Sequence, residues 1–197
     1  MRAVYLDIPE SALRERRARG LDMLDEMWEG ELHLVPLPSL DHQDIVSELT
    51  KFLRLECGRR QHGRVFAQTG VHDPARPKDS YRGPDLSFGA KGNERVLHKR
   101  GIVGAADSVI EIRSEDDETY EKFPFFTRLG VREVIVIPVA SRKPEVYRLS
   151  GSRLVTVKPE RGGWVSAEVL GVRMRAIPGK CRVRIEALDD SKQAVEV

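Results

Sequence analysis

The segments GPDLSF (83–88), VIEIRS (109–114) and YEKF (120–123), followed by Gly130 and Val131, decide the fold of this chain. Two short apolar stretches that read as strands carry one carboxylate each, Asp85 and Glu111, and a helix expected just downstream carries Lys122. Two carboxylates and a cation that are brought together can form a divalent-metal site for phosphodiester chemistry. The order and spacing of these residues, more than any one of them, predict such a site.

The apolar segments around this stretch predict the centre of a sheet. Residues 108–113 read as a strand with Val109, Glu111 and Arg113 on one face, and 131–138 as a buried central strand because its apolar run is nearly continuous. A further strand is expected at 144–149. The acidic run 115–118 suits a helix start, but Pro124 requires that the helix begin near Glu121 or bend. Asp85 and Glu111 should therefore lie on neighbouring strands.

The segments before and between the central strands predict two helices, a hairpin, a further strand and loops. We expect a basic helix over 9–19, a hairpin over 21–36 that turns at Glu29 and Gly30, and a helix over 41–57. Ser39 or Asp41 can cap that second helix, and Gly58 is expected to end it. Residues 65–71 read as one strand, whereas 73–82 and 91–104 read as loops, the latter with at most one helical turn.

The C-terminal part of the chain alternates between short strands and turns. We expect strands at 154–157, 164–169, 172–177 and 183–188, with a hairpin turn at Gly162 and Gly163, and a frayed tail over 189–197. Since no long linker interrupts the sequence, residues 1–197 are expected to form a single domain with an N-terminal extension at 1–20.

Composition limits the classes of function. Thirty-three basic and 31 acidic residues give a net charge of +2, which argues against a strong unspecific nucleic-acid binder, although basic residues cluster at 14–19 and 173–184. Cys57 and Cys181 are far apart and indicate neither a disulfide framework nor a zinc site. No apolar run reaches membrane-spanning length and no signal peptide is evident, so a cytoplasmic location is expected.

Each candidate residue also has an ordinary structural interpretation. Asp85 could cap a turn, and Glu111, which burial would otherwise penalise, could form a salt bridge with Arg113 on the same face. Lys122 could be a solvated helix lysine, and His42 a capping group at a helix start. Glu31 could have a purely structural role in the hairpin.

Four groups of residues give the chain a resemblance to a known family. They are Gly30-Glu31-Leu32 with Pro36, Pro38, Ser39 and His42; Pro84-Asp85; Glu111 with Ser114; and Lys122, Phe126, Gly130 and Val131. In order and spacing they resemble the PD-(D/E)XK nuclease superfamily, and more closely the Uma2 family of putative restriction endonucleases, also called DUF820. The resemblance covers roughly residues 20 to 190. It implies an α/β restriction-endonuclease-like fold with a mixed central sheet flanked by helices and additional antiparallel strands at both ends.

The resemblance also implies roles for the site residues. Asp85, Glu111 and the backbone carbonyl of Ile112 would hold Mg²⁺ or Mn²⁺. The superfamily motif has a lysine two positions after the acid, where this chain has Arg113, and Lys122 matches a lysine that has migrated to the following helix. Glu31 could supply a third carboxylate, and His42 matches a frequent family histidine. Arg113 can grip a phosphate but is a poor base.

The function expected from these observations is Mg²⁺-dependent hydrolysis of phosphodiester bonds, in DNA, by a homodimer. Two alternatives remain open. The chain could be a non-catalytic dimeric scaffold or interaction protein that keeps the nuclease fold, which would have no need of metal. It could also bind nucleic acid without cleaving it, and that binding would depend on salt but not on metal.

Overall fold

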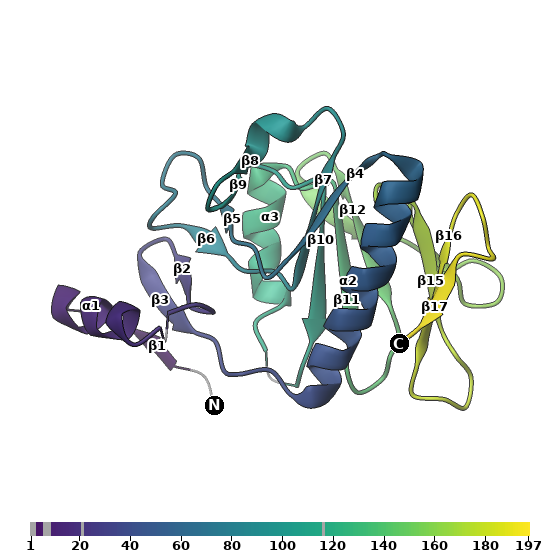
Figure 1. Ribbon diagram of the computed structural model, residues 1–197, viewed down its shortest axis with the longest axis horizontal. Coiled ribbons are helices and arrows are strands. Elements are labelled where there is room, and N and C mark those ends of the chain that lie inside the picture. Colours follow the sequence, from purple (N-terminus) through teal and green to yellow (C-terminus); the bar gives the residue numbers. More distant parts are fainter. Residues whose placement is uncertain (1–2, 6–8, 21, 116) are drawn as a thin grey trace.

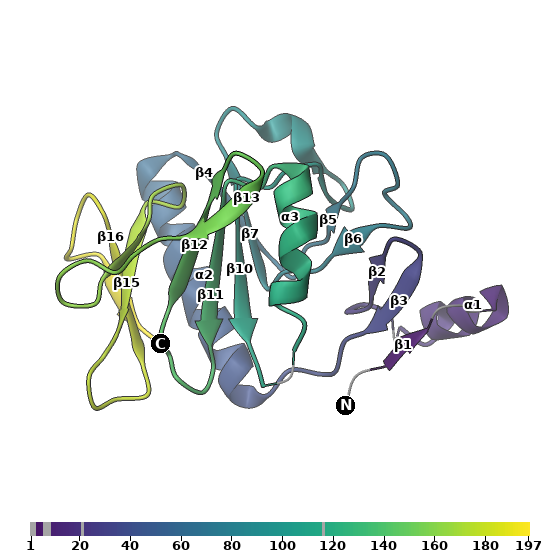
Figure 2. The same ribbon diagram turned by 180° about the vertical axis from the view of Figure 1, so that it is seen from behind.

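The computed structural model describes residues 3–5, 9–20, 22–115 and 117–197 of the chain. A central mixed sheet is covered by helix α2 (Leu40–Arg60) on one face and by helix α3 (Phe123–Leu129) on the other (Figures 1 and 2). Two further sheets lie at the ends of the molecule, one built by the N-terminal strands and one by the C-terminal strands (Figure 1). The expected restriction-endonuclease-like architecture is confirmed.

The central sheet has six strands in the order β13-β12-β11-β10-β7-β4. They are β4 (Gly63–Ala67), β7 (Leu86–Ala90), β10 (Ser108–Arg113), β11 (Glu133–Pro138), β12 (Glu145–Ser150) and β13 (Arg153–Thr156). β10 and β11 pair in parallel, with Glu111 opposite Val136, and all other pairs are antiparallel. The apolar run predicted to be central is fully buried in β11.

Helix α2 packs its apolar stripe on the face of the central sheet that presents Ile110 and Ile112. The side-chain oxygen of Ser39 accepts a hydrogen bond from the amide of His42 and caps the first turn. The prediction that Gly58 ends the helix is wrong, because the helix continues through it to Arg60 and ends where Gln61 adopts a left-handed conformation with φ 48°. Exposed polar residues can extend a helix past a glycine at a cost of about 1 kcal/mol.

Helix α3 begins as the first of the two alternatives expected from Pro124. A 3₁₀ turn η2 (Tyr120–Lys122) leads into the α-helix, so that Pro124 stands in the first helical turn, where it costs little. Phe125 and Phe126 pack against Val109 and Val134 on the second face of the central sheet. Gly130 closes the helix at φ 86°.

The N-terminal sheet has seven short strands in the order β1-β3-β2-β6-β5-β9-β8. They are β1 (Ala3–Tyr5), β2 (Glu26–Trp28), β3 (Glu31–Leu34), β5 (Val71–His72), β6 (Tyr81–Arg82), β8 (Leu97–His98) and β9 (Gly101–Val103). Helix α1 (Glu10–Ala18) precedes the β2–β3 hairpin, which turns at Glu29 and Gly30 as expected. All these elements lie on one side of the molecule (Figure 1).

The N-terminal region differs from its predicted structure in two places. The single strand expected over 65–71 is two strands in different sheets, because Gln68 takes a left-handed φ of 47° and redirects the chain. The segments expected as loops contribute β6, β8 and β9, together with the 3₁₀ turn η1 (Glu94–Val96). These pieces are too short to give a periodic pattern in the sequence.

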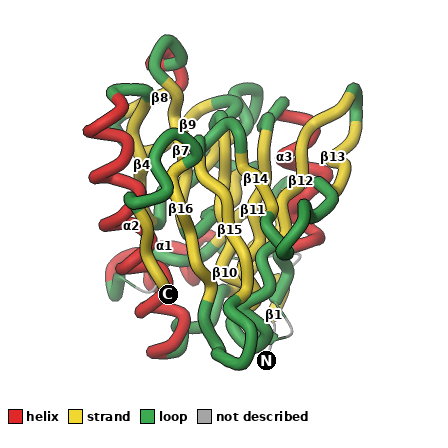
Figure 3. Tube along the Cα trace, turned by 90° about the vertical axis from the view of Figure 1, so that its right-hand side faces the viewer, coloured by secondary structure: helices red, strands yellow, loops and turns green. Residues whose placement is uncertain are grey.

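The C-terminal sheet has four antiparallel strands in the order β14-β15-β16-β17. They are β14 (Val165–Ala167), β15 (Val172–Ala176), β16 (Val183–Ala187) and β17 (Ala194–Glu196), and Figure 3 looks onto the end of the molecule that they form. The prediction of a frayed tail over 189–197 is wrong. β17 pairs with β16, and Val197 is buried and exchanges two backbone hydrogen bonds with Val183. Within the described part of the chain, no helix is both long and apolar enough to cross a membrane.

Candidate active site

Asp85 lies immediately before β7, at the end of the central sheet where β10 finishes, so it neighbours the strand of Glu111 as predicted. One carboxylate oxygen accepts a hydrogen bond from the amide of Ile112 at 2.7 Å, and the other lies 3.3 Å from Nε2 of His42 in the first turn of α2. Burial alone lowers the pKa of His42, but the hydrogen bond and charge of Asp85 outweigh it, so the pKa is raised. His42 is therefore tied to Asp85 as well as to the helix cap.

Glu111 is a buried carboxylate inside β10, only 3% exposed. Its Oε2 accepts a hydrogen bond from Nζ of Lys122 at 3.2 Å, whereas its buried Oε1 has no hydrogen-bond partner among the described residues. Burial raises the pKa of Glu111 well above its usual value despite the nearby ammonium, and the negative charges of Asp85 and Glu26 raise it further. The strand thus holds one carboxylate oxygen that is removed from water and uncompensated.

Lys122 lies between two carboxylates, and the second belongs to Glu26, a residue that sequence analysis did not identify. The ammonium is 2.9 Å from Oε1 of Glu26, in strand β2 of the N-terminal sheet. Burial by itself lowers the pKa of Lys122, but the attraction of Glu111 and Glu26 is larger and raises it, so Lys122 is charged at neutral pH. The interpretation of Lys122 as a solvated lysine is wrong, because its side chain is only 11% exposed.

Glu26 is held by three donors at once. It accepts hydrogen bonds from the indole of Trp28 at 2.7 Å and from the amide of Gly83 at 2.9 Å, in addition to the ion pair with Lys122. Burial would raise its pKa, but the charge of Lys122 and these hydrogen bonds lower it, so the carboxylate is ionised. No comparable signal marks Glu26 in the sequence, because it follows Asp25, whereas Glu111 lies between Ile110 and Ile112.

Arg113 does not pair with Glu111, although both are on strand β10. Its Nε lies 3.9 Å from Asp117 and its guanidinium lies 5.1 Å from the ring centroid of Tyr120, with about a third of the side chain exposed. The expected Glu111–Arg113 salt bridge is therefore wrong, because the shorter path to Glu111 is taken by Lys122. Arg113 remains at the rim, where its guanidinium can reach a ligand.

Glu31 is exposed on β3 and the structure does not bring it to Lys122, so Glu26 provides the carboxylate of this hairpin instead. Opposite Glu26, His33 stacks on Trp28 with ring centroids 4.0 Å apart, and its Nδ1 lies 2.8 Å from Glu118. These side chains form the wall of the site on the side of the N-terminal sheet.

The oxygen atoms of the candidate site are of the kind that a divalent cation binds. Among the residues that the structure describes, no group of three or more His, Cys, Asp or Glu side chains is arranged to hold a metal ion. Asp85 and Glu111 nevertheless suit Mg²⁺, which binds one or two carboxylates and takes its remaining ligands from water and substrate phosphate. The unpartnered Oε1 of Glu111 and the backbone carbonyl of Ile112, which faces His42, are oxygen donors of the right kind.

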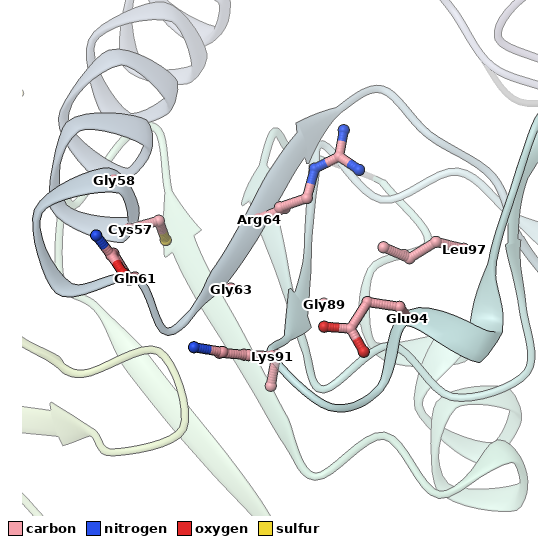
Figure 4. Close-up of a pocket in the computed structure, with 10 residues that line it drawn as sticks. Cys57, Gly58, Gln61, Gly63, Arg64, Gly89, Lys91, Glu94 and Leu97 are labelled. Carbon is pink, nitrogen blue, oxygen red and sulfur yellow. The ribbon is translucent and has the colours of Figure 1, made fainter.

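A separate pocket of about 270 Å³ lies at the opposite end of β7 and of α2. Figure 4 shows its lining, with Arg64, Lys91 and Glu94 as its charged side chains. None of the predicted site residues contributes to it. The predicted site residues lie instead at the other end of β7, where strands β7 and β10 bring Asp85 and Glu111 close to Lys122.

Comparison with known proteins identifies the family of the chain. The family model Uma2, described as "Putative restriction endonuclease", matches residues 19–177. The chain belongs to the Uma2 family. Among solved structures, this Uma2 chain is similar to a putative nuclease belonging to DUF820 from Anabaena variabilis, with a TM-score of 0.59 and 19% sequence identity over 74% of this chain and 82% of that one. No curated protein matches the sequence.

Proposed function

We propose that this chain is a nuclease that hydrolyses phosphodiester bonds in DNA with the help of Mg²⁺ or Mn²⁺. The observation that carries the proposal is the buried Glu111, whose Oε1 lacks a partner among the described residues although Asp85 and Lys122 are its neighbours. A buried carboxylate of this kind is stable when a cation binds it. Membership of the Uma2 family supports the nuclease class.

Asp85, Glu111 and the carbonyl of Ile112 are the residues that would hold the cation. When bound, a divalent cation lowers the pKa of a coordinated water and stabilises negative charge on the phosphate. The amide of Ile112 fixes the orientation of Asp85, and His42 restrains its second oxygen. The two carboxylates are thus oriented by the strand and by the helix before any ligand arrives.

Lys122 acts in this proposal as a fixed positive charge. Because its pKa is raised, it keeps its proton at neutral pH and is a hydrogen-bond donor, not a general base. It can orient the attacking water or neutralise charge that develops on the phosphate. Glu26 is a positioning residue, since its ion pair at 2.9 Å fixes the ammonium beside Glu111.

Arg113 is the second cation of the site, and we propose that it grips a phosphate at the rim. Its guanidinium is partly exposed and can form two parallel hydrogen bonds to phosphate oxygens. We further propose that the working unit is a homodimer, because cutting both strands of a duplex requires two sites that a two-fold axis can supply.

One observation favours the alternative of a scaffold without catalysis. The Glu26–Lys122–Glu111 bridge ties the N-terminal sheet to the central sheet through the protein's own charges. A protein that had kept the fold only as a framework could retain these residues for stability alone. Metal binding separates the two functions, because a scaffold does not need it.

The test compares melting and cleavage in matched variants. Mn²⁺ should raise the melting temperature of the wild type by mass action, and Glu111→Gln and Asp85→Asn should lose that increment. Glu31→Gln, which alters an exposed carboxylate on the β2–β3 hairpin, should keep the increase in melting temperature. Cleavage of mixed DNA substrates should need Mg²⁺ or Mn²⁺ and disappear in the first two variants.

A third comparison assigns the catalytic cation. Lys122→Arg retains the charge but changes its geometry, and it should abolish cleavage while metal still raises the melting temperature. If cleavage survives in Lys122→Arg and is lost in Arg113→Ala, Arg113 is the catalytic cation. If Mn²⁺ changes neither melting nor cleavage in any of these proteins, the nuclease proposal fails and the scaffold function stands.

A further inference from the structure

The outer face of the C-terminal sheet presents arginines around a tryptophan, and we call Arg173, Arg175, Arg184 and Trp164 the arginine face. On β15 and β16 the side chains of Val172, Met174, Val183 and Ile185 enter the core, so the alternate residues point outward. The guanidinium groups of Arg173 and Arg175 each lie 4.5 Å from the ring centroid of Trp164. Stacking of this kind restricts the guanidinium planes and prepares them for a ligand.

The charges on this face are not balanced. Glu186, which is buried, accepts hydrogen bonds from both Arg173 and Arg184, and Arg184 also donates to Glu196. The side chain of Arg175 makes neither a hydrogen bond nor an ion pair with any described residue. The Nε of Arg175 is even buried without a partner. Arg175 also stands directly opposite Arg184 in the sheet, and like charges in that position destabilise a strand pair. An anionic ligand would relieve both conditions.

The arginine face is connected to the candidate active site along one edge of the molecule. Arg175 and Arg184 stand near the end of the β15–β16 hairpin, whose tip carries Lys180 and Arg182. The thiol of Cys181 in that tip lies 3.6 Å from the carbonyl of Ala140, and the amide of the adjacent Val139 donates to the carbonyl of Arg113. Hence the hairpin tip and the end of β10 meet at the turn that follows β11.

That turn contains a second arginine without a partner. Arg142 is only 9% exposed, and its Nε and Nη1 are buried without a hydrogen bond in the described part of the chain. Its backbone takes a left-handed φ of 53°, which holds the residue in the tight turn between β11 and β12. Arg142 therefore lies between Arg113 and the arginine face, and both Arg142 and Arg175 have buried polar atoms without a partner among the described residues.

We propose that the arginine face binds the phosphate backbone of duplex DNA that flanks the scissile bond. This proposal rests on the proposed nuclease function. Duplex DNA presents closely spaced negative charges along its length, about one every 1.7 Å of helix axis. Guanidinium groups with fixed planes suit its phosphate oxygens, since they can donate two parallel hydrogen bonds. The contacts are to the backbone, so this face adds affinity without sequence preference.

The experiment measures the binding of a fluorescently labelled duplex by anisotropy in EDTA, across a series of salt concentrations. Wild type, Arg175→Ala and Arg175→Glu are compared with Arg153→Ala. Arg153 is an exposed arginine of β13 that pairs with Ser150 in β12. This end of β12 lies beside Glu133, at the start of β11, whereas the turn with Arg142 follows the other end of β11 at Pro138. The slope of log affinity against log salt should fall by about 0.9 in Arg175→Ala, the value for one lost phosphate contact. It should fall at least as far in Arg175→Glu and stay at the wild-type value in Arg153→Ala.

The outcomes distinguish this inference from the nuclease proposal. Equal slopes in wild type and Arg175→Glu overturn the inference, whether or not Mn²⁺ supports cleavage of the same duplex. A change of mass in light scattering for Arg175→Glu, without a change in DNA binding, also overturns it and identifies a protein contact. If the slope falls as expected but no metal supports cleavage, the face binds DNA and the nuclease function is wrong. Unchanged melting temperatures show that the variants are folded.

Discussion

Lys122 compensates two buried carboxylates, because its ammonium lies 2.9 Å from Glu26 and 3.2 Å from Glu111. Neither carboxylate can be hydrated where it stands, since both residues are at most 3% exposed. The cost of their burial therefore depends on one cation. Substitutions at the three positions are not equivalent, because only the removal of Lys122 leaves two buried carboxylates without a cation.

Lys122→Ala should be strongly destabilising. Removing one partner of a buried ion pair costs about 3 to 5 kcal/mol, and here the loss falls on two carboxylates. Glu111→Gln should cost much less, since Glu26 still pairs with Lys122. The free energy of unfolding from urea titration measures both, with Lys51→Ala, at an exposed helix lysine, as the control that should change little. A Lys122→Ala protein as stable as the wild type would contradict the bridge.

The loss in Lys122→Ala should depend on pH in a defined direction. Without the ammonium, the buried Glu26 and Glu111 have folded-state pKa values above their unfolded values. Stability from such groups is present below the unfolded pKa and is lost as pH rises through the folded pKa. The difference from wild type should thus be smaller near pH 5 than near pH 8.

At this scale the sequence predicted residues whose signal is local. Glu111 stood out because a carboxylate interrupts an apolar strand, whereas Asp85 and Lys122 were identified by their order and spacing together with the family resemblance. Glu26 was missed because its role depends on how the hairpin packs on the central sheet, and no local pattern encodes that packing. The choice of Lys122 over Arg113 as partner of Glu111 is likewise a three-dimensional fact.

Helix α2 shows how an element can exceed its predicted end. Gly58 lies in the last turns of α2 and Gly63 at the start of β4 (Figure 4). Gly58 is exposed and a Cβ there would meet no atom within 4 Å, whereas a Cβ at Gly63 would meet the ring of Phe88. The first glycine is thus a replaceable residue inside a helix. The second is required by a close approach of the chain to β7.

Gly58→Ala should stabilise the protein by about 0.5 to 1 kcal/mol, because alanine restricts the unfolded chain and suits a helix interior. Gly63→Ala should destabilise it by about 1 to 3 kcal/mol, since its Cβ would stand 2.5 Å from the backbone oxygen of Gly89. Thermal unfolding of the two variants measures both signs. A loss of stability in Gly58→Ala would mean that the helix does not pass through this position.

Strands were predicted where the apolar run was long enough. They were missed where a segment becomes a strand only by pairing with a neighbouring strand. β10 was predicted with its observed bounds and β11 within two residues, because each runs through the buried centre of the sheet. Residues 189–197, which include β17, were interpreted as a frayed tail because the segment is mostly polar, yet the edge of β16 offers β17 a ladder of backbone hydrogen bonds. Edge strands of this kind depend on a neighbour and not on their own composition.

At the scale of the whole molecule, the architecture was expected from the family resemblance, and the order of the elements is consistent with it. An apolar strand, a helix and a second apolar strand in succession are typical of a parallel pair. β10 and β11, which α3 separates in the sequence, form such a pair. The split of the N-terminal strands between two sheets could not be predicted, because it depends on left-handed residues such as Gln68.

If the chain works as a dimer, its mass in solution should be twice that of one chain. Light scattering coupled to size exclusion, across a range of protein concentrations, measures this mass. The expectation follows from the need for two sites on a duplex with antiparallel strands. A monomer mass at the highest concentration would contradict the homodimer and would restrict the proposed nuclease to nicking one strand.

The Glu26–Lys122 ion pair also constrains the order in which the chain can fold. Its two residues are separated by roughly half of the sequence, so the hairpin that carries Glu26 leaves the ribosome long before its partner does. Contacts between such distant residues pay their loop-closure entropy late and slow the search for the native state. The arrangement of Glu26, Lys122 and Glu111 is thus expected to be completed only after β10 and η2 have been synthesised, so a nascent chain lacks the candidate site until then.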